Sequence, residues 1–195
     1  MSAPPSWLAW ERAYARASFG VRPGAGARWL SPHLARLHPD ARVLDLGCGN
    51  RPATREAGAD AILLDASAAA LAAAVGPRRL RADACALPFR DACVQAIVAR
   101  HVFGHLREDE RKAASGECRR VLSSDGRMLV EAFARGDLRD PGTGVAVRQE
   151  LRTGYASATE VASWFPGFSP VELREESVET RYGARRRVVG AFAPT

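Results

Sequence analysis

The feature that most limits the fold of this chain is a short apolar run, Arg42-Val43-Leu44-Asp45-Leu46, which ends directly in Gly47-Cys48-Gly49. An apolar run of this length is typical of a buried strand in a parallel sheet. Two glycines straight after such a strand let the backbone turn sharply, and they bring its amides against a ligand with no Cβ in the way. The pattern therefore predicts a parallel sheet with a ligand-binding loop after this strand.

Strands and helices alternate along the chain after this turn. The spacing predicts strands at Ala61–Leu64, Arg79–Ala82, Val94–Ala99 and Met128–Phe133, and helices at Ala68–Val75 and Arg107–Leu122. Such alternation predicts an α/β fold with a Rossmann-like, doubly wound, mostly parallel sheet and helices on both faces. Two late strands, Val171–Glu176 and Arg186–Phe192, must pair as a hairpin or straddle a short crossover, because parallel neighbours need a longer connection. We therefore also expect a late antiparallel strand.

The two ends of the chain show weaker patterns. Apolar residues at helical spacing predict helices over Pro5–Ser18 and Ala27–Leu37, with a Gly/Pro break at Gly20–Gly26 between them. Toward the other end, the patterns predict a loop at Ala134–Gly144, a strand at Val145–Leu151 and a helix at Ser157–Trp164.

Composition limits the class of protein. A chain of 195 residues is long enough for one domain with a sizeable core. The net charge of +6 comes almost wholly from scattered arginines, with Lys112 the only lysine, which favours a solvated surface over an anionic partner. No signal peptide or membrane-spanning run is evident, and four cysteines without a CxxC pair fit reduced thiols. We expect a cytoplasmic protein without membrane association; the sequence gives no signal of oligomeric state.

Two acidic residues stand at the ends of the next strands. Asp65 ends the second strand twenty positions after Asp45. In an open α/β sheet this position sets a carboxylate against the ribose hydroxyls of an adenosine ligand. Asp83 ends the third strand, where its side chain can reach an adenine amine. The series of acids predicts an adenosine-containing ligand.

Four segments together resemble a known family. Asp45-Leu46-Gly47-Cys48-Gly49, Asp65, Asp83-Ala84 followed by Leu87-Pro88-Phe89, and Val98–Leu106 are similar to motifs of class I S-adenosylmethionine-dependent methyltransferases, most closely the small single-domain type 11 branch. The resemblance covers residues 40 to 133. It implies that S-adenosylmethionine, giving S-adenosylhomocysteine as product, is bound by Asp45, Gly47, Cys48, Gly49, Asp65, Ala66, Asp83, Ala84 and Arg100.

The resemblance also implies a division of the chain and a local departure. We expect a single domain, residues 1–195, with an N-terminal helical cap (1–40), a cofactor-binding core (41–133) and an acceptor-side loop with C-terminal strands (134–195). The family often has a further glycine two residues after Gly49, where this chain has Arg51 and then Pro52. The helix that follows must therefore be short or displaced.

Methyl transfer from a sulfonium by in-line displacement needs alignment and exclusion of water more than acid–base help. His101, after the fourth strand, is the candidate catalytic residue, to orient or deprotonate the acceptor. His105 is expected to be structural, and no metal site is predicted because the pair lacks a third ligand. Cys48 is expected to pack. The aromatic residues Trp7, Trp10, Tyr14 and Trp29 are expected to pack in the core or between elements, with a lid of Trp10 or Tyr14 over the cofactor as the alternative.

The acceptor class is less constrained. A small molecule is favoured, since the segment after the fourth strand lacks the Asn/Asp-Pro-Pro-aromatic motif of many enzymes that methylate nucleic acid or protein, although those acceptors stay possible. The polar segment Arg135–Tyr155, with Arg148 and Arg152, is expected to help build the acceptor pocket. Two other classes compete: a non-catalytic methyltransferase-like partner subunit and, less favoured, a nicotinamide-dependent dehydrogenase.

Overall fold

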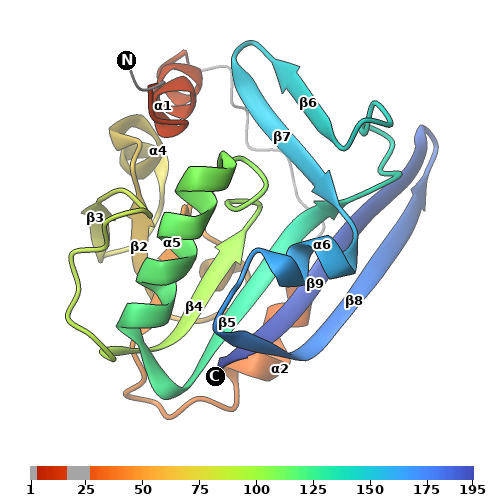
Figure 1. Ribbon diagram of the computed structural model, residues 1–195. Coiled ribbons are helices and arrows are strands. Elements are labelled where there is room, and N and C mark those ends of the chain that lie inside the picture. Colours follow the sequence, from red (N-terminus) through yellow and green to blue (C-terminus); the bar gives the residue numbers. More distant parts are fainter. Residues whose placement is uncertain (1–3, 17–26) are drawn as a thin grey trace.

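The computed structural model describes residues 4–16 and 27–195. Within these ranges the chain alternates between strands and helices, as Figure 1 shows. The helices are α1 (Trp7–Ala15), the 3-10 helix η1 (Arg28–Leu30), α2 (Ser31–Leu34), α3 (Ala53–Glu56), α4 (Ala68–Ala73), α5 (Glu108–Val121) and α6 (Ala158–Ser163). The strands are β1 (Val43–Leu46), β2 (Ile62–Asp65), β3 (Arg79–Arg81), β4 (Val94–Arg100), β5 (Leu122–Ala134), β6 (Val145–Arg148), β7 (Leu151–Ala156), β8 (Phe168–Thr180) and β9 (Gly183–Pro194).

The sheet is mostly parallel. Its strands run in the order β3-β2-β1-β4-β5-β7-β6, and β9 pairs with both β5 and β8. β1 to β5 are parallel to their neighbours, whereas β9 runs antiparallel to β5, with Met128 opposite Phe192 and Phe133 opposite Arg187. The predicted fold class, a mostly parallel sheet with a late antiparallel strand, is confirmed.

Helices cover both faces of the sheet, as expected (Figure 1). Buried side chains form one cluster that includes α5 and α6 and a second cluster that includes η1, α2, α3 and α4. Phe103, Phe165 and Phe192 are fully buried in the first, and Trp29 and Leu30 are buried in the second. Two apolar layers, one on each face, explain why β1 and β4 are almost continuously apolar.

Several element boundaries differ from the predictions. The single strand predicted at Val145–Leu151 is a hairpin of β6 and β7, because Gln149 and Glu150 take left-handed conformations and reverse the chain. Tight hairpins favour Asn or Gly at such positions, so this turn carries no sequence signal. β5 begins directly after α5, so that residues 123–126 belong to the strand instead of a turn.

The elements near both ends of the chain also differ in detail from the predictions. The predicted Ala27–Leu37 helix is only η1 followed by α2, and the predicted Pro5–Ser18 helix ends at Ala15. The Gly20–Gly26 break lies outside the described residues. The two late strands form a long antiparallel hairpin, β8–β9, which decides between the two predicted arrangements. Throughout the described ranges, helices fall short of the length and apolar character that crossing a bilayer requires.

Candidate functional site

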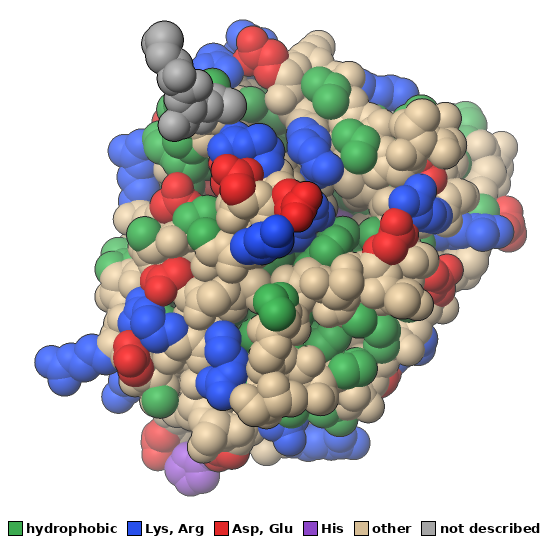
Figure 2. All heavy atoms as spheres, in the orientation of Figure 1, with side chains coloured by type: hydrophobic (Ala, Val, Ile, Leu, Met, Phe, Trp, Pro, Cys, Tyr) green, Lys and Arg blue, Asp and Glu red, His purple; other side chains and the backbone are tan. Residues whose placement is uncertain are grey.

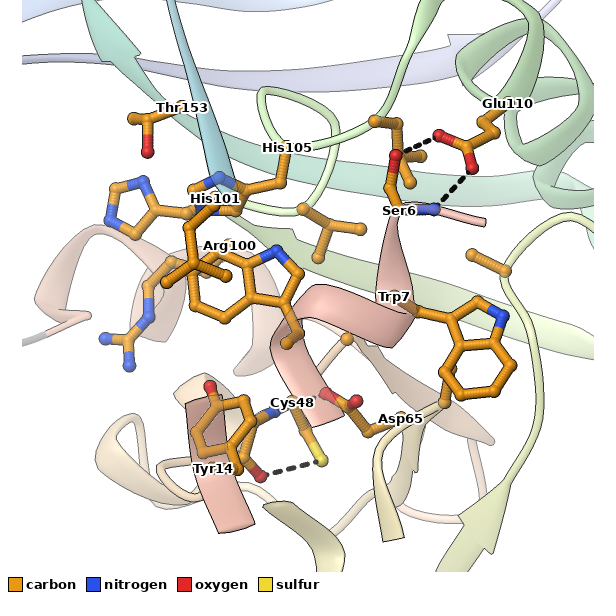
Figure 3. Close-up of a pocket in the computed structure, with 18 of the residues that line it drawn as sticks. Ser6, Trp7, Tyr14, Cys48, Asp65, Arg100, His101, His105, Glu110 and Thr153 are labelled. Carbon is orange, nitrogen blue, oxygen red and sulfur yellow. Dashed lines mark hydrogen bonds between the residues drawn. The ribbon is translucent and has the colours of Figure 1, made fainter. Parts of the chain in front are cut away.

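One large cavity opens at the carboxyl ends of β1, β2 and β4, with a volume of about 1120 Å³. Figure 3 shows Cys48, Asp65 and Tyr14 toward one end of it, and His101, His105 and Thr153 toward the other. All ten residues that the sequence indicated line this one cavity: Asp45, Gly47, Cys48, Gly49, Asp65, Ala66, Asp83, Ala84, Arg100 and His101. The fold thus brings together residues spread over 57 positions of the chain, from 45 to 101.

Asp45 joins β1 to the residues that follow the glycine loop, through hydrogen bonds with Thr54. Its side chain is only 1% exposed, and Oδ2 accepts hydrogen bonds from the Thr54 amide at 2.9 Å and the Thr54 hydroxyl at 2.7 Å. Burial raises the pKa of Asp45 to about 6, although the hydrogen bonds from Thr54 oppose this. Asp45 therefore fixes the start of α3, which is one turn long, as Arg51 and Pro52 predicted.

Asp65 joins the loop to the next strand. Its Oδ2 accepts a hydrogen bond from the Gly49 amide at 2.8 Å, and its Oδ1 accepts one from the Ser67 amide at 2.8 Å. Burial raises the pKa of Asp65, and these two hydrogen bonds oppose the rise. Gly49 has φ +57°, and a Cβ there would lie 2.6 Å from the Tyr14 hydroxyl, so this position requires glycine.

The other predicted residues lie around this loop. Asp83 Oδ1 accepts a hydrogen bond from the Cys85 amide at 2.9 Å. The Arg100 guanidinium lies at the cavity rim, where Nη1 is 2.8 Å from a Glu56 oxygen and Nη2 donates to the Arg51 carbonyl at 3.0 Å. Cys48 is buried and burial raises the pKa of its thiol, so the group stays neutral and packs.

Helix α1 lies over the cavity (Figure 3) and is held by polar contacts, since none of its residues is buried. Glu11 accepts hydrogen bonds from the Ser67 hydroxyl at 2.5 Å and from the Ala69 amide at 3.3 Å. At the helix start, Ser6 donates to Glu110 from its amide and its hydroxyl. The predicted lid residues, Trp10 and Tyr14, both line the cavity.

His101 is fixed by two neighbours from β5. The residue has φ +63°, its Nε2 lies 3.2 Å from Glu131 Oε1, and its ring stacks on Phe133 with centres 3.8 Å apart. Nδ1 is buried and has no hydrogen-bond partner among the described residues. The imidazole is therefore held with one edge against a carboxylate and its plane against an aromatic ring.

Sequence reasoning missed Glu131. This carboxylate is 5% exposed and binds three groups far apart in the chain: the Trp29 indole N–H at 2.7 Å, His101, and Arg187 at 3.3 Å. Burial by itself raises the pKa of Glu131. The hydrogen bond and charge of His101, the charge of Arg187 and the hydrogen bond from Trp29 outweigh this effect and lower the pKa to about 2. The available signal was one acid within the apolar strand Met128–Phe133.

His105 has a different environment. Its Nδ1 lies 2.6 Å from the Arg152 carbonyl oxygen, which can only accept, so Nδ1 carries the hydrogen. The ring lies 4.5 Å from the Trp10 ring centre. Burial lowers the pKa of His105 to about 4, so it is neutral at pH 7.

We expect the His105→Gln variant to lose part of the pH dependence of stability. In the folded state His105 stays neutral down to about pH 4, whereas its ordinary pKa is 6.5. Between these values the unfolded state binds more protons, so the free energy of unfolding falls as pH drops. Chemical denaturation at pH 7 and pH 4.5 measures the fall, which should be smaller in the variant. The exposed His38→Gln is the control, and an equal fall in all three proteins would contradict the expectation.

The end of the cavity beyond His101 is built by the last residues of β5 and by the segment that follows it. Its lining residues are Phe133, Arg139, Ala146, Arg148, Gln149, Leu151, Thr153 and Tyr155. Arg148 and Tyr155 were expected here. Arg152 was expected too but does not line the cavity; its Nη1 donates instead to the carbonyls of Gly104 at 2.8 Å and Leu106 at 3.2 Å. It ties the β6–β7 hairpin to the segment after β4.

Residues 44–130 match the family model of a methyltransferase domain, type 11. This range contains β1 to β4 and most of β5, and with them all ten predicted site residues. None of the curated proteins matched the chain.

Solved structures match the fold over almost the whole chain. The Burkholderia thailandensis 1,6-didemethyltoxoflavin-N1-methyltransferase, with bound 1,6-didemethyltoxoflavin and S-adenosylhomocysteine, is 17% identical (TM-score 0.74, covering 100% of this chain and 92% of that chain). A SAM-dependent methyltransferase from Anabaena variabilis is 16% identical (TM-score 0.73, 99% and 96%). A chain from the Haloferax volcanii complex that contains the Trm112 methyltransferase activator is 18% identical (TM-score 0.69, 99% and 99%).

At these identities the structural matches show the fold, while the family match and the motifs within it show the activity. The matched range includes the glycine loop after β1 and the carboxylate that ends β2. The chain therefore carries a methyltransferase domain over residues 44–130, similar to those of the class I, type 11 methyltransferases, and it is an enzyme that uses S-adenosylmethionine as the methyl donor.

Proposed function

We propose that the protein methylates a small molecule held in the same cavity as S-adenosylmethionine. The observation that carries this proposal is the single cavity of about 1120 Å³, which joins the ten predicted residues to the acceptor-side segment. A pocket that binds one drug-sized ligand has a volume of roughly 300–1,000 Å³. The cavity is large enough to enclose a cofactor and a small acceptor together, under α1.

The cofactor half fits an adenosine ligand with a charged amino-acid tail. We propose that the backbone of Gly47 and Gly49 contacts the tail and that Asp65 accepts hydrogen bonds from the ribose. Asp65 accepts from the amides of Gly49 and Ser67, and a carboxylate has about four acceptor sites, so it keeps acceptor capacity for the ribose. Ala66, Asp83 and Ala84 line the place proposed for adenine, and Asp45, Cys48 and Arg100 support the loop around it.

When bound, the cofactor supplies an electrophilic methyl group on a positively charged sulfonium. The protein has to align the acceptor atom with that methyl group and exclude water. We propose that His101 contacts the acceptor and that Glu131 and Phe133 hold its ring in place. The Glu131 carboxylate can only accept, so Nε2 carries the hydrogen of a neutral His101, and Nδ1 is the atom proposed to take a proton from an acceptor that carries one.

Several observations support a small acceptor over a macromolecule. α1 covers the cavity, and the likeness in fold to an enzyme crystallised with 1,6-didemethyltoxoflavin agrees with a small ring compound. Figure 2 shows Lys and Arg side chains interspersed with Asp and Glu over the face in view, in contrast to a basic nucleic-acid surface. The likeness in fold to the chain from the Haloferax complex supports a second proposal, that the protein binds a partner protein such as an activator subunit.

We further propose that residues 1–195 form a single domain of the layout predicted above, and that the protein works in the cytoplasm. All four cysteines are free, which suits a reducing compartment.

The wild-type protein is expected to bind S-adenosylmethionine and S-adenosylhomocysteine with a Kd on the order of 1 μM, about −8 kcal/mol. Isothermal titration calorimetry measures this, and a rise in melting temperature at saturating cofactor gives an independent check. NADH serves as the control and should give no heat. Absence of both heat and thermal shift with the two sulfur compounds would refute the proposed cofactor site, and binding of NADH alone would support the dehydrogenase.

His101→Ala should lower turnover by at least about tenfold and leave cofactor affinity within about threefold, because its contact forms with the acceptor. An unbiased metabolite screen with the wild-type enzyme first supplies an acceptor, and production of S-adenosylhomocysteine then measures turnover. The exposed His38→Gln is the control. An equal loss of cofactor binding would make His101 a cofactor ligand. Unchanged turnover would mean that His101 lines the cavity without a role in methyl transfer.

A further inference from the structure

The two halves of the cavity differ in charge: the cofactor half has two arginines, Arg51 and Arg100, together with acids, whereas the acceptor half has arginines without acids in its described lining. Every acid among the described lining residues belongs to the cofactor half and its rim: Asp45, Asp65, Asp83 and Glu110. The acceptor half, lined from Phe133 to Tyr155, contributes two arginines, Arg139 and Arg148, and no acid to the described lining. A ligand in the acceptor half therefore meets positive charge.

The guanidinium group of Arg139 is held by Asp137 and by the Phe133 ring. Nε donates to Asp137 at 2.7 Å, and Cζ lies 4.1 Å from the centre of the Phe133 ring. Asp137 is shared, because it also accepts from Arg185 Nε at 3.3 Å and from the Arg186 amide at 2.9 Å. Nη2 of Arg139 is buried without a hydrogen-bond partner among the described residues. A buried donor in this state destabilises the protein unless a ligand binds it.

Arg148 faces the same region from β6. Its side chain is exposed and forms none of the hydrogen bonds or ion pairs found among the described residues. Arg139, Arg148 and Tyr155 all line this half of the cavity. Burial raises the pKa of Tyr155; the charges of Arg139 and Arg148 oppose the rise, and those of Asp137 and Asp140 add to it. The nearby acid Asp140 is already bound to the amides of Gly136, Gly142 and Gly144.

We propose that the acceptor carries an anionic oxygen group, a carboxylate or a phosphate, which binds Arg139 and Arg148 beside Tyr155. This inference rests on the proposed function and names its substrate class. Arginine forks match carboxylate and phosphate oxygens in geometry and charge. His101 and Arg139 each lie within 4.1 Å of the centre of the Phe133 ring, so they must occupy opposite faces of it. The anionic group and the methyl-accepting atom are therefore different parts of the acceptor.

The test uses the full-length protein saturated with S-adenosylhomocysteine and matched pairs of ring compounds. The pairs are benzoate with benzamide, 4-hydroxybenzoate with 4-hydroxybenzamide, and indole-3-acetate with indole-3-acetamide; phenyl phosphate is a separate arm. Ligand-observed saturation-transfer NMR measures binding. We expect at least one anion to bind about tenfold tighter than its amide, or phenyl phosphate to bind, and the arm that responds distinguishes carboxylate from phosphate.

Variants assign the effect to the two arginines. Arg148→Gln lies at an exposed position and should keep its stability while it reduces anion binding by about fivefold or more. Arg139→Gln removes a partner from buried Asp137, so a melting curve accompanies its binding data. Arg135→Gln is the matched control, because Arg135 pairs with Glu160 and does not line the cavity.

Each outcome decides the proposal. The proposal is supported if an anion binds more tightly than its amide to the wild-type protein and to the Arg135→Gln control, and if that anion binds more weakly to Arg148→Gln or to folded Arg139→Gln. It is overturned if every amide binds as tightly as its acid, if no anion binds, or if anion binding survives both cavity variants. Calorimetry with S-adenosylhomocysteine precedes the screen, so failure of the cofactor site is recognised separately from failure of the anion site.

Discussion

Replacing Glu131 with alanine should lower the free energy of unfolding by about 3–5 kcal/mol, the usual cost of removing one partner from a buried charge pair. The carboxylate accepts from the Trp29 indole and contacts both His101 and Arg187. Without it, three buried or half-buried donors lose their acceptor, and the Arg187 charge keeps only Glu176. Chemical denaturation monitored by tryptophan fluorescence measures the change.

The control for this prediction shares a partner with Glu131. Glu176 also binds Arg187 but is 25% exposed, so Glu176→Ala should cost less than about 1 kcal/mol. Glu131→Gln, which keeps one acceptor oxygen, should lie between the two. Similar losses in both alanine variants would show that Glu131 is not the centre of the network.

The low pKa of Glu131 adds a pH dependence to the same prediction. Its folded pKa of about 2 lies below the ordinary 4.5, so its contribution is complete above pH 4.5 and is lost as pH falls toward 2. The wild-type protein should therefore lose more stability than Glu131→Ala between pH 4.5 and pH 2.5.

Asp65→Ala is expected to weaken S-adenosylhomocysteine binding by about 10- to 100-fold, which corresponds to roughly 1.5–3 kcal/mol of lost charge-assisted hydrogen bonds. The structure adds a second reason. Asp65 holds the Gly49 amide, so its removal also releases the loop that faces the ligand. Calorimetry measures the affinity, and circular dichroism should show an intact fold because Asp65 ends its strand outside the core.

Two further variants separate these contributions. Asp65→Asn retains one acceptor oxygen and should lose less affinity than alanine. Asp60→Ala removes an exposed carboxylate two residues before the same strand, outside the cavity, and should bind like the wild type. Wild-type affinity in Asp65→Ala would mean that this carboxylate does not face the ribose.

The order of strands and helices was predictable because each element carries its own local signal. β1 and β4 read as apolar runs, Ser67 caps α4 by accepting from the Ala70 amide, and the glycines after β1 adopt the left-handed conformations that their type favours. The β6–β7 hairpin lacked such a signal, since non-glycine residues form its turn. That hairpin supplies six of the eight residues that line the acceptor half, so the acceptor side was predicted least well.

The sequence by itself determined the cofactor half, because its residues end strands that follow one another in a parallel sheet. Once the strands are recognised, topology alone brings Asp45, Gly49 and Asp65 to one edge. The contacts of Glu131 had no such rule: its partners Trp29 and Arg187 lie 102 and 56 positions away, on η1 and β9. Only the tertiary structure decided these contacts, as it decided the position of α1 over the cavity and the presence of Arg139 and Arg148 in one cavity lining. Contacts between distant segments depend on how whole layers pack.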